Sequence, residues 1–232
     1  MDMLEYEKSL YENGVNYIAG VDEVGRGPLY GPVVTAAVIL PKGYFLEGLT
    51  DSKKLTPKKR DEFFDIIMKN ALSVSIGTNS SKRIDKVNIY EATKEAMYEA
   101  IENLSIRPEH VLIDAMKLEK LDIPYTSIIK GDAKSESIAA ASVIAKVTRD
   151  RMLIEEGKLH PEYGFEKHKG YPTKEHIEAV KKYGVLEDYR LTFEPIKSII
   201  NGSDEYGKEK KEKYKHEKRQ CKTKATKCKA RN

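Results

Sequence analysis

The chain has 232 residues, of which 40% are hydrophobic and 34% charged, and its formal net charge is +4. This composition describes a globular domain with extensions, and the absence of any run of about 18 apolar residues excludes a membrane-spanning helix. Two cysteines, Cys221 and Cys228, match neither a disulfide framework nor a common zinc spacing. The polar N-terminus lacks the pattern of a signal peptide, so we expect a cytoplasmic protein.

Several short segments have the apolar or alternating pattern of β-strands. A Gly/Pro-rich turn joins the first two, which favours an antiparallel pair, whereas the later ones favour crossover connections. The order predicts an α/β fold with a mixed sheet and helices on its faces. The expected strands are residues 17–23, 33–40, 72–77, 111–114 and 125–129.

Other segments have apolar residues at helical spacing. Thr56 and Pro57 are typical of an N-cap and a first helical residue, and Thr173 is the expected N-cap of a later helix. In the helix that begins at Pro57, the side chains expected to point inward are Phe63, Phe64, Ile66 and Ile67. The other expected helices are residues 85–104, about 133–156 and 174–182.

Two adjacent carboxylates, Asp22 and Glu23, stand at the end of the first expected strand. Neighbouring negative charges repel, and desolvation adds to that cost. The pair is explained either as an ordinary polar strand end before a turn or as part of a cation site. Asp114 ends the fourth expected strand and Asp132 precedes a helix, so each, taken alone, also fits a polar strand end or a helix cap.

Strand ends in an open α/β sheet meet at one crevice, so the four acids together favour a metal site. Their oxygen ligands indicate Mg²⁺ or Mn²⁺ rather than zinc. Two such ions about 4 Å apart can activate water and stabilise a leaving oxygen in phosphoryl displacement. Three histidines are too irregularly spaced for a ligand set and are expected to be solvated helix or loop residues: His160, His168 and His176.

Longer sequence blocks surround these acids. They are Gly20-Val-Asp22-Glu23-Val-Gly25-Arg26-Gly27-Pro, Asp51-Ser-Lys-Lys-Leu, Leu112-Ile-Asp114, Lys130-Gly-Asp132-Ala-Lys-Ser and Gly164-Phe…His168-Lys-Gly-Tyr171-Pro. In content and order, over about residues 17–195, they resemble ribonuclease HII, the type 2 ribonuclease H of prokaryotes. Two departures are Ala115-Met116, where Gly and a polar residue are expected, and Tyr30, where small residues are usual.

The resemblance implies a ribonuclease H-like fold with a mixed five-stranded sheet in residues 1–200, ending in a helical extension from about residue 157. It implies metal-dependent cleavage of the RNA strand of RNA–DNA hybrids and at single ribonucleotides embedded in duplex DNA, leaving 3′-hydroxyl and 5′-phosphate ends. We expect a monomer that acts in ribonucleotide excision repair and DNA replication.

The resemblance also assigns residue roles. Gly25, Arg26 and Gly27 would contact the ribose 2′-hydroxyl, the group that distinguishes RNA from DNA. Tyr171 would read the ribonucleotide–deoxyribonucleotide junction by stacking, although by residue type alone packing is the more usual role of a tyrosine. The metal-binding catalytic acids would be Asp22, Glu23, Asp114 and Asp132.

Three alternatives remain at this point. A ribonuclease HIII-like enzyme would share the carboxylates but carry a different loop after them and an extra N-terminal domain. A non-catalytic hybrid-binding module is disfavoured because all four acids are present. A generic Mg²⁺ phosphatase would need a nucleophile motif, which the sequence lacks.

Residues 202–232 carry twelve Lys/Arg and five Asp/Glu, a net charge near +7, which leaves the rest of the chain near −3. With almost no apolar content, this tail (residues 201–232) is expected to be disordered and either to add phosphate contacts or to take no part in binding. Within the body we expect a group of lysines to contact phosphates: Lys53, Lys54, Lys134 and Lys146.

Overall fold

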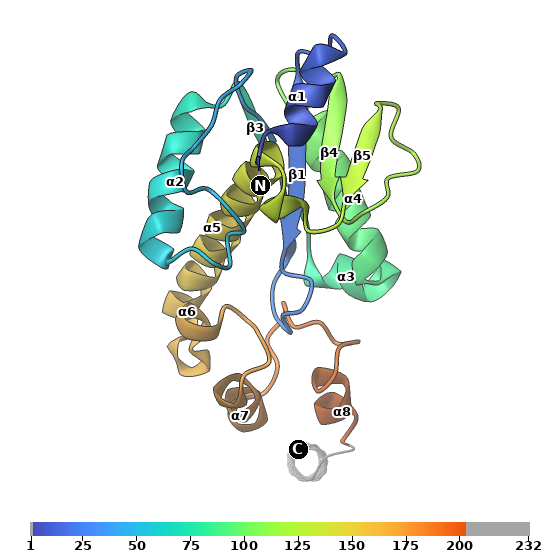
Figure 1. Cartoon of the computed structure of the whole chain (residues 1–232). Coiled ribbons are helices and arrows are strands. Elements are labelled where there is room, and N and C mark those ends of the chain that lie inside the picture. The colour runs from blue at the N-terminus through green and yellow to red at the C-terminus, as the bar shows by residue number, and fades with distance from the viewer. Residues whose placement is uncertain (1, 203–232) are drawn as a thin grey trace, which may run out of the picture.

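The computed structural model describes residues 2–202 (Figure 1). Its sheet has the strand order β3-β2-β1-β4-β5. The antiparallel pairs are β1 with β2 and β2 with β3, whereas β4 is parallel to both β1 and β5. The strands are β1 (Ile18–Val24), β2 (Val33–Ile39), β3 (Ser73–Asn79), β4 (His110–Asp114) and β5 (Tyr125–Ile128). The predicted mixed five-stranded sheet is therefore confirmed.

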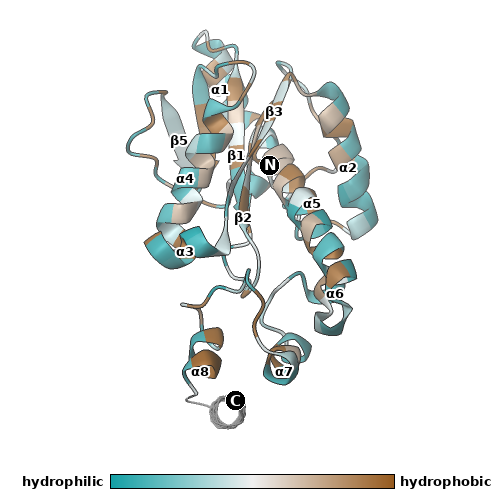
Figure 2. Ribbon diagram, turned by 180° about the vertical axis from the view of Figure 1, so that it is seen from behind, coloured by the Kyte–Doolittle hydropathy of each residue, from teal (hydrophilic) through white to brown (hydrophobic). Residues whose placement is uncertain are grey.

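Helices cover both faces of the sheet (Figures 1 and 2). On one face α2 and α5 pack on β2, and on the other α4 packs on β1, β2 and β4. The helices are α1 (Glu5–Glu12), α2 (Pro57–Asn70), α3 (Ser81–Val87), α4 (Ile89–Glu102), α5 (Glu136–Leu159), α6 (Phe165–His168), α7 (Lys174–Tyr183) and α8 (Ile196–Asn201). Two 3₁₀ turns, Gly131–Ala133 and Pro161–Tyr163, precede and follow α5.

The first turn of α5 crosses β1 at very short range. A Cβ atom added to Gly20 would lie 2.0 Å from the carbonyl carbon of Ser137, so only glycine fits between the strand and the helix. This crossing brings the start of α5, and the 3₁₀ turn before it, over the acidic end of β1.

The C-terminal helices form a second core below the sheet (Figure 1). Tyr30 reaches into it from the turn between β1 and β2, and its ring stacks on Phe165 with centroids 4.2 Å apart. Its hydroxyl donates a hydrogen bond to Glu156 Oε2 at 2.8 Å. The tyrosine that departs from the family pattern therefore ties the β1–β2 turn to the C-terminal extension.

The strand predictions hold to within two residues at each end, and Thr56 and Thr173 cap α2 and α7 as expected. The single helix predicted over 85–104 is wrong. The chain breaks at Asn88, which adopts φ +73° and accepts hydrogen bonds from the backbone N–H groups of Tyr90 and Glu91, so it caps a new helix. A positive φ is uncommon for residues other than glycine, and asparagine is among the residues that adopt it most often.

Further expectations about helices need correction. In α2, Phe63 and Ile67 are buried and Phe64 is partly buried, but Ile66 is exposed, because it lies on the outer side of the helix. The helix predicted from about 133 begins at Glu136, since Gly131–Ala133 forms a 3₁₀ turn instead. The short helices α1, α6 and α8 were not predicted.

Within residues 2–202, no helix is both long and apolar enough to cross a bilayer. The expected basic tail over 201–232 lies, apart from its first two residues, outside the described part of the chain, and so do both cysteines.

Candidate functional site

Three carboxylates meet where β1, β4 and the turn before α5 come together. The parallel register pairs Val21 of β1 with Ile113 of β4, so the next residues, Asp22 and Asp114, lie side by side. The 3₁₀ turn adds Asp132. One carboxylate oxygen from each of these three residues lies within 4.8 Å of the other two.

Backbone N–H groups fix two of these carboxylates. Asp22 Oδ1 accepts a hydrogen bond from Glu23 N, and Asp114 Oδ1 accepts one from Gly131 N, each at 2.7 Å. Asp114 is therefore held by the same turn that carries Asp132. The residue that follows β4, Ala115, adopts φ +48°, a conformation that glycine enters more easily than alanine.

Glu23 lies beside this cluster rather than within it. Its Oε1 atom is 3.5 Å from Arg26 Nη1, whereas its Oε2 atom is buried and has no hydrogen-bond partner within residues 2–202. A buried carboxylate oxygen without a donor is costly, so this atom calls for a ligand that the protein itself does not supply.

The site carries an excess of buried negative charge. Burial raises the pKa of Asp22 well above its ordinary value, and the charges of Glu23 and Asp114 raise it further. Burial also raises the pKa of Glu23 and of Asp132. A bound divalent cation would relieve this repulsion, and the all-oxygen donor set fits Mg²⁺ or Mn²⁺.

The carboxylates Asp22 and Glu23 open into a hollow of about 450 Å³. It is also lined by Ser52, Lys53, Arg60, Ser142, Lys146 and Tyr171. Desolvation of the Lys53 ammonium lowers its pKa, but Asp22, Asp51 and Asp132 outweigh this effect and raise the pKa above its ordinary value. Of the four lysines expected to contact phosphates, Lys53 and Lys146 line this hollow, and Lys54 and Lys134 do not.

The loop with Gly25, Arg26 and Gly27 is held from behind by two fully buried arginines. Arg190 donates hydrogen bonds to the carbonyl oxygens of Gly25 at 2.6 Å, Arg26 at 3.0 Å and Gly31 at 2.9 Å. Arg149 donates from Nε to Pro32 O at 3.0 Å. Gly25 has φ +95°, and a Cβ there would lie 2.4 Å from Arg149 Nε, so both the backbone and the arginine require glycine.

Arg149 also joins this loop to the segment that carries Tyr171. Its two terminal nitrogens donate to Tyr30 O and Lys169 O, each at 2.9 Å. As a result Tyr171 lies against Gly27, where a Cβ atom would be 3.6 Å from the tyrosine ring. Tyr171 is 37% exposed and lines the hollow together with Asp22 and Glu23.

Two of the histidines support Tyr171 from below, so the expectation that they are solvated is wrong: His168 and His176 are buried. Their rings stack with centroids 4.2 Å apart, and His176 Nδ1 is 2.9 Å from Tyr171 O. His176 Nε2 lies 2.7 Å from the hydroxyl of Tyr189. Burial lowers the pKa of His176 to about 4, so its ring is neutral at physiological pH and serves as a support.

Known proteins resemble this chain over most of its length. The family model for Ribonuclease HII matches residues 19–194. The chain belongs to the ribonuclease HII family. A Ribonuclease HII of Bacillus cytotoxicus is 61% identical over 200 residues, which cover 86% of this chain and 77% of that protein. This membership makes the protein a ribonuclease H, an endonuclease that acts on RNA–DNA hybrids, and removes the phosphatase alternative.

Solved structures agree with the fold. The ribonuclease H2 of Pyrococcus horikoshii OT3 is 29% identical, with a TM-score of 0.68 over 78% of this chain and 96% of that one. Bst-RNase HIII, solved in complex with Mn²⁺, is 17% identical with a TM-score of 0.60, covering 79% of this chain and 68% of that one, and shows the shared fold alone. The ribonuclease H-like fold is therefore confirmed.

Sequence reasoning missed several residues of this site. Asp51 lies close enough to Asp132 to raise the pKa of its carboxyl group, and Ser142 of α5 lies close enough to Asp22 to lower the pKa of that carboxyl group. Ser142 Oγ is in turn 2.9 Å from Ser52 Oγ. Asp51 and Ser52 lie in the second of the sequence blocks that resemble the family, which was the available signal. No signal in the sequence indicated that Arg149 and Arg190 would be buried behind the loop.

Proposed function

We propose that this ribonuclease HII is a divalent-metal-dependent endonuclease that cuts the RNA strand of RNA–DNA hybrids and single ribonucleotides embedded in duplex DNA. Hydrolysis of the phosphodiester would leave 3′-hydroxyl and 5′-phosphate ends. The observation that carries this proposal is the convergence of three carboxylates within 4.8 Å of one another next to the unpartnered Oε2 atom of Glu23.

The residues proposed to hold the metal are Asp22, Glu23, Asp114 and Asp132. When bound, two Mg²⁺ or Mn²⁺ ions supply an acidified water and neutralise charge on the phosphate and the leaving oxygen. The protein contributes positioning: the β1–β4 register and the turn before α5 fix the carboxylates before any substrate arrives.

Recognition of the ribonucleotide is proposed for the loop of Gly25, Arg26 and Gly27 and for Tyr171. The buried Arg190 draws three loop carbonyls inward, which leaves the opposite side of the backbone for the ribose 2′-hydroxyl. Tyr171, in contact distance of Gly27, would stack on the sugar or base that follows.

One chain supplies all these residues, which supports the proposal that the enzyme works as a monomer. We also propose, from the family resemblance, that it acts in the cytoplasm in ribonucleotide excision repair and DNA replication. Residues 1–200 would form the catalytic domain, with the basic tail after them.

The decisive experiment compares duplex DNA holding one ribonucleotide, a long RNA–DNA hybrid and an all-DNA duplex, each with EDTA, Mg²⁺ or Mn²⁺. We expect cleavage of the first two only with metal, and product ends that DNA ligase and phosphatase assays identify as 3′-hydroxyl and 5′-phosphate. Cleavage of the hybrid without cleavage at the single ribonucleotide would favour the ribonuclease HIII-like alternative. Binding without cleavage in the presence of metal would contradict the proposed reaction.

A further inference from the structure

A second hollow, of about 310 Å³, continues from the one at the carboxylates. The two are contiguous because Arg60 and Lys146 line both. The second hollow lies between α2 and the C-terminal half of α5, and reaches α6. We call it the basic groove, since its charged lining consists of Arg60, Lys146, Arg151, Lys167 and Lys169 against Asp61 and Asp150.

The two acids of the basic groove are already neutralised. Lys146 Nζ is 2.7 Å from Asp150 Oδ1, one helical turn along α5, and both side chains are 16% exposed. Arg151 Nη2 is 3.1 Å from Asp61 Oδ1 at the rim. Neither acid is therefore available to balance the remaining cations.

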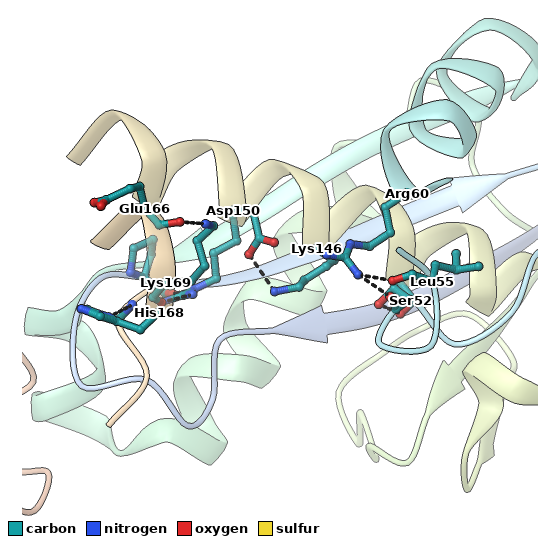
Figure 3. Close-up of polar contacts among 12 residues, drawn as sticks. Ser52, Leu55, Arg60, Lys146, Asp150, Glu166, His168 and Lys169 are labelled. Atoms are coloured by element: carbon teal, nitrogen blue, oxygen red, sulfur yellow. Dashed lines mark hydrogen bonds and ion pairs between the residues drawn. The ribbon is translucent and has the colours of Figure 1, made fainter. Parts of the chain in front are cut away.

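Three cations have no carboxylate within ion-pair distance in the described part of the chain. Arg60 donates only to backbone carbonyl oxygens, Ser52 O at 3.0 Å and Leu55 O at 2.6 Å (Figure 3). Lys169 donates to Glu166 O, again a carbonyl. Lys167 is exposed and takes part in no ion pair among residues 2–202. The groove thus carries a net charge of about three positive units, which an anion would balance.

The position of the groove indicates which anion. From Ser142, which lines the hollow at the carboxylates together with Asp22, to Asp150 the helix α5 advances eight residues, about 12 Å at 1.5 Å per residue. At about 3.4 Å of rise per nucleotide of one strand, this distance corresponds to roughly three or four nucleotides. A nucleic-acid backbone bound at the carboxylates would therefore bring another phosphate to the groove.

We propose that the basic groove binds the phosphodiester backbone of one strand of the substrate, roughly three or four nucleotides from the cut. Lys167 and Lys169 make the contacts, and Arg60 links the groove to the hollow at the carboxylates. Because Arg149 holds Lys169 O, the groove is fixed to the segment that carries Tyr171. This inference deepens the proposed function and rests on it for the position of the cut.

The first test is the salt dependence of binding by the Lys167→Gln/Lys169→Gln variant. Duplex DNA with one ribonucleotide is titrated in EDTA and followed by fluorescence anisotropy, so the result does not depend on metal or cleavage. Loss of two phosphate contacts should reduce the slope of log Kd against log salt by about two. The matched control is Lys69→Gln/Lys86→Gln, which removes two exposed lysines outside both hollows and should keep the wild-type slope.

The second test replaces single phosphates with neutral methylphosphonates along each strand. A substitution about three or four nucleotides from the cut should weaken binding by the wild type and have no further effect on the lysine variant. A wild-type slope in that variant, or equal weakening by methylphosphonates at every position, would overturn the proposal. Absence of cleavage by the wild type in Mg²⁺ would instead overturn the proposed function, so the two failures are distinguishable.

Discussion

The carboxylate cluster and the loop beside it both contain buried charge, but they balance it differently. Asp22, Asp114 and Asp132 converge without a neighbouring cation that pairs with all of them. Arg149 and Arg190 are fully buried without a carboxylate in ion-pair distance among the described residues, yet backbone carbonyls occupy their guanidinium groups.

This difference separates a ligand site from a structural support. Carbonyl oxygens of the chain satisfy the arginines, so their charges need nothing from solution. Even so, burial lowers the pKa of Arg149 to about 10 and that of Arg190 to about 9, which reflects the cost of the arrangement. Asp22 and Asp114 each accept only one backbone N–H hydrogen bond, and no cationic side chain pairs with the whole cluster, so a bound divalent cation would balance their charge.

The largest effect is expected from Asp132→Asn in the carboxylate cluster. Turnover should fall at least about a thousandfold, because one proposed metal ligand loses its charge. Stability should hold or rise, since like charges repel at this site. The matched change Asp65→Asn, at an exposed position of α2, should alter neither. Steady-state turnover in Mg²⁺ and thermal unfolding in EDTA measure the two effects, and wild-type turnover of Asp132→Asn would refute the assignment.

In the arginine-held loop, Arg190→Lys should lower the free energy of unfolding by about 3 kcal/mol, because an ammonium cannot reach all three carbonyl oxygens that the guanidinium binds. Arg107→Lys is the control, since Arg107 pairs with Asp122 on the surface and its side chain is 71% exposed. Urea denaturation provides the measurement. A loss no larger than that of the control would mean that the carbonyls find other donors at little cost.

A third buried acid, Glu136 at the start of α5, belongs to neither the carboxylate cluster nor the arginine-held loop. Burial raises the pKa of Glu136 to about 7, from an ordinary value of 4.5. The folded state then binds a proton that the unfolded state has released between these two values. Glu136 therefore contributes most stability below pH 4.5, and this contribution is lost as the pH rises through 7.

Glu136→Gln should remove that dependence and raise the free energy of unfolding by about 2 kcal/mol at pH 8, with little change at about pH 4.5. The amide oxygen can still accept the hydrogen bond from Leu46 N, which the carboxylate accepts at 2.7 Å. Urea denaturation at the two pH values measures the difference, with the exposed Glu102→Gln as control. Equal changes at both pH values would show that Glu136 does not titrate in this range.

The smallest effect concerns specificity. Tyr171→Ala should slow cleavage at a single embedded ribonucleotide about tenfold more than cleavage of a long hybrid, because stacking of the ring is lost. Tyr171→Phe keeps the ring and should behave like the wild type. The measurement is kcat/KM on both substrates. If Tyr171→Ala slows both equally, the ring has a packing role and the junction is read elsewhere.

Much of the fold could be predicted from the sequence because its signals are local. Alternation and β-branched residues marked the strands, and Thr56 and Thr173 marked helix starts through side-chain caps that depend on only a few neighbouring residues. The break at Asn88 was missed, because apolar spacing continues across it and does not register the positive φ that separates α3 from α4.

The sequence by itself determined the chemistry of the candidate site: adjacent acids at strand ends, a glycine-rich turn after them, and oxygen ligands typical of a hard cation. Only the tertiary structure decided which groups meet. It placed Asp22, Asp114 and Asp132 together, left Glu23 beside them, and brought Asp51 and Ser142 to the site. It also turned Arg149 and Arg190 inward. The sequence alone could not show these contacts, because they depend on strand register and on the crossing of α5 over Gly20. Both bring together residues that are far apart in the chain.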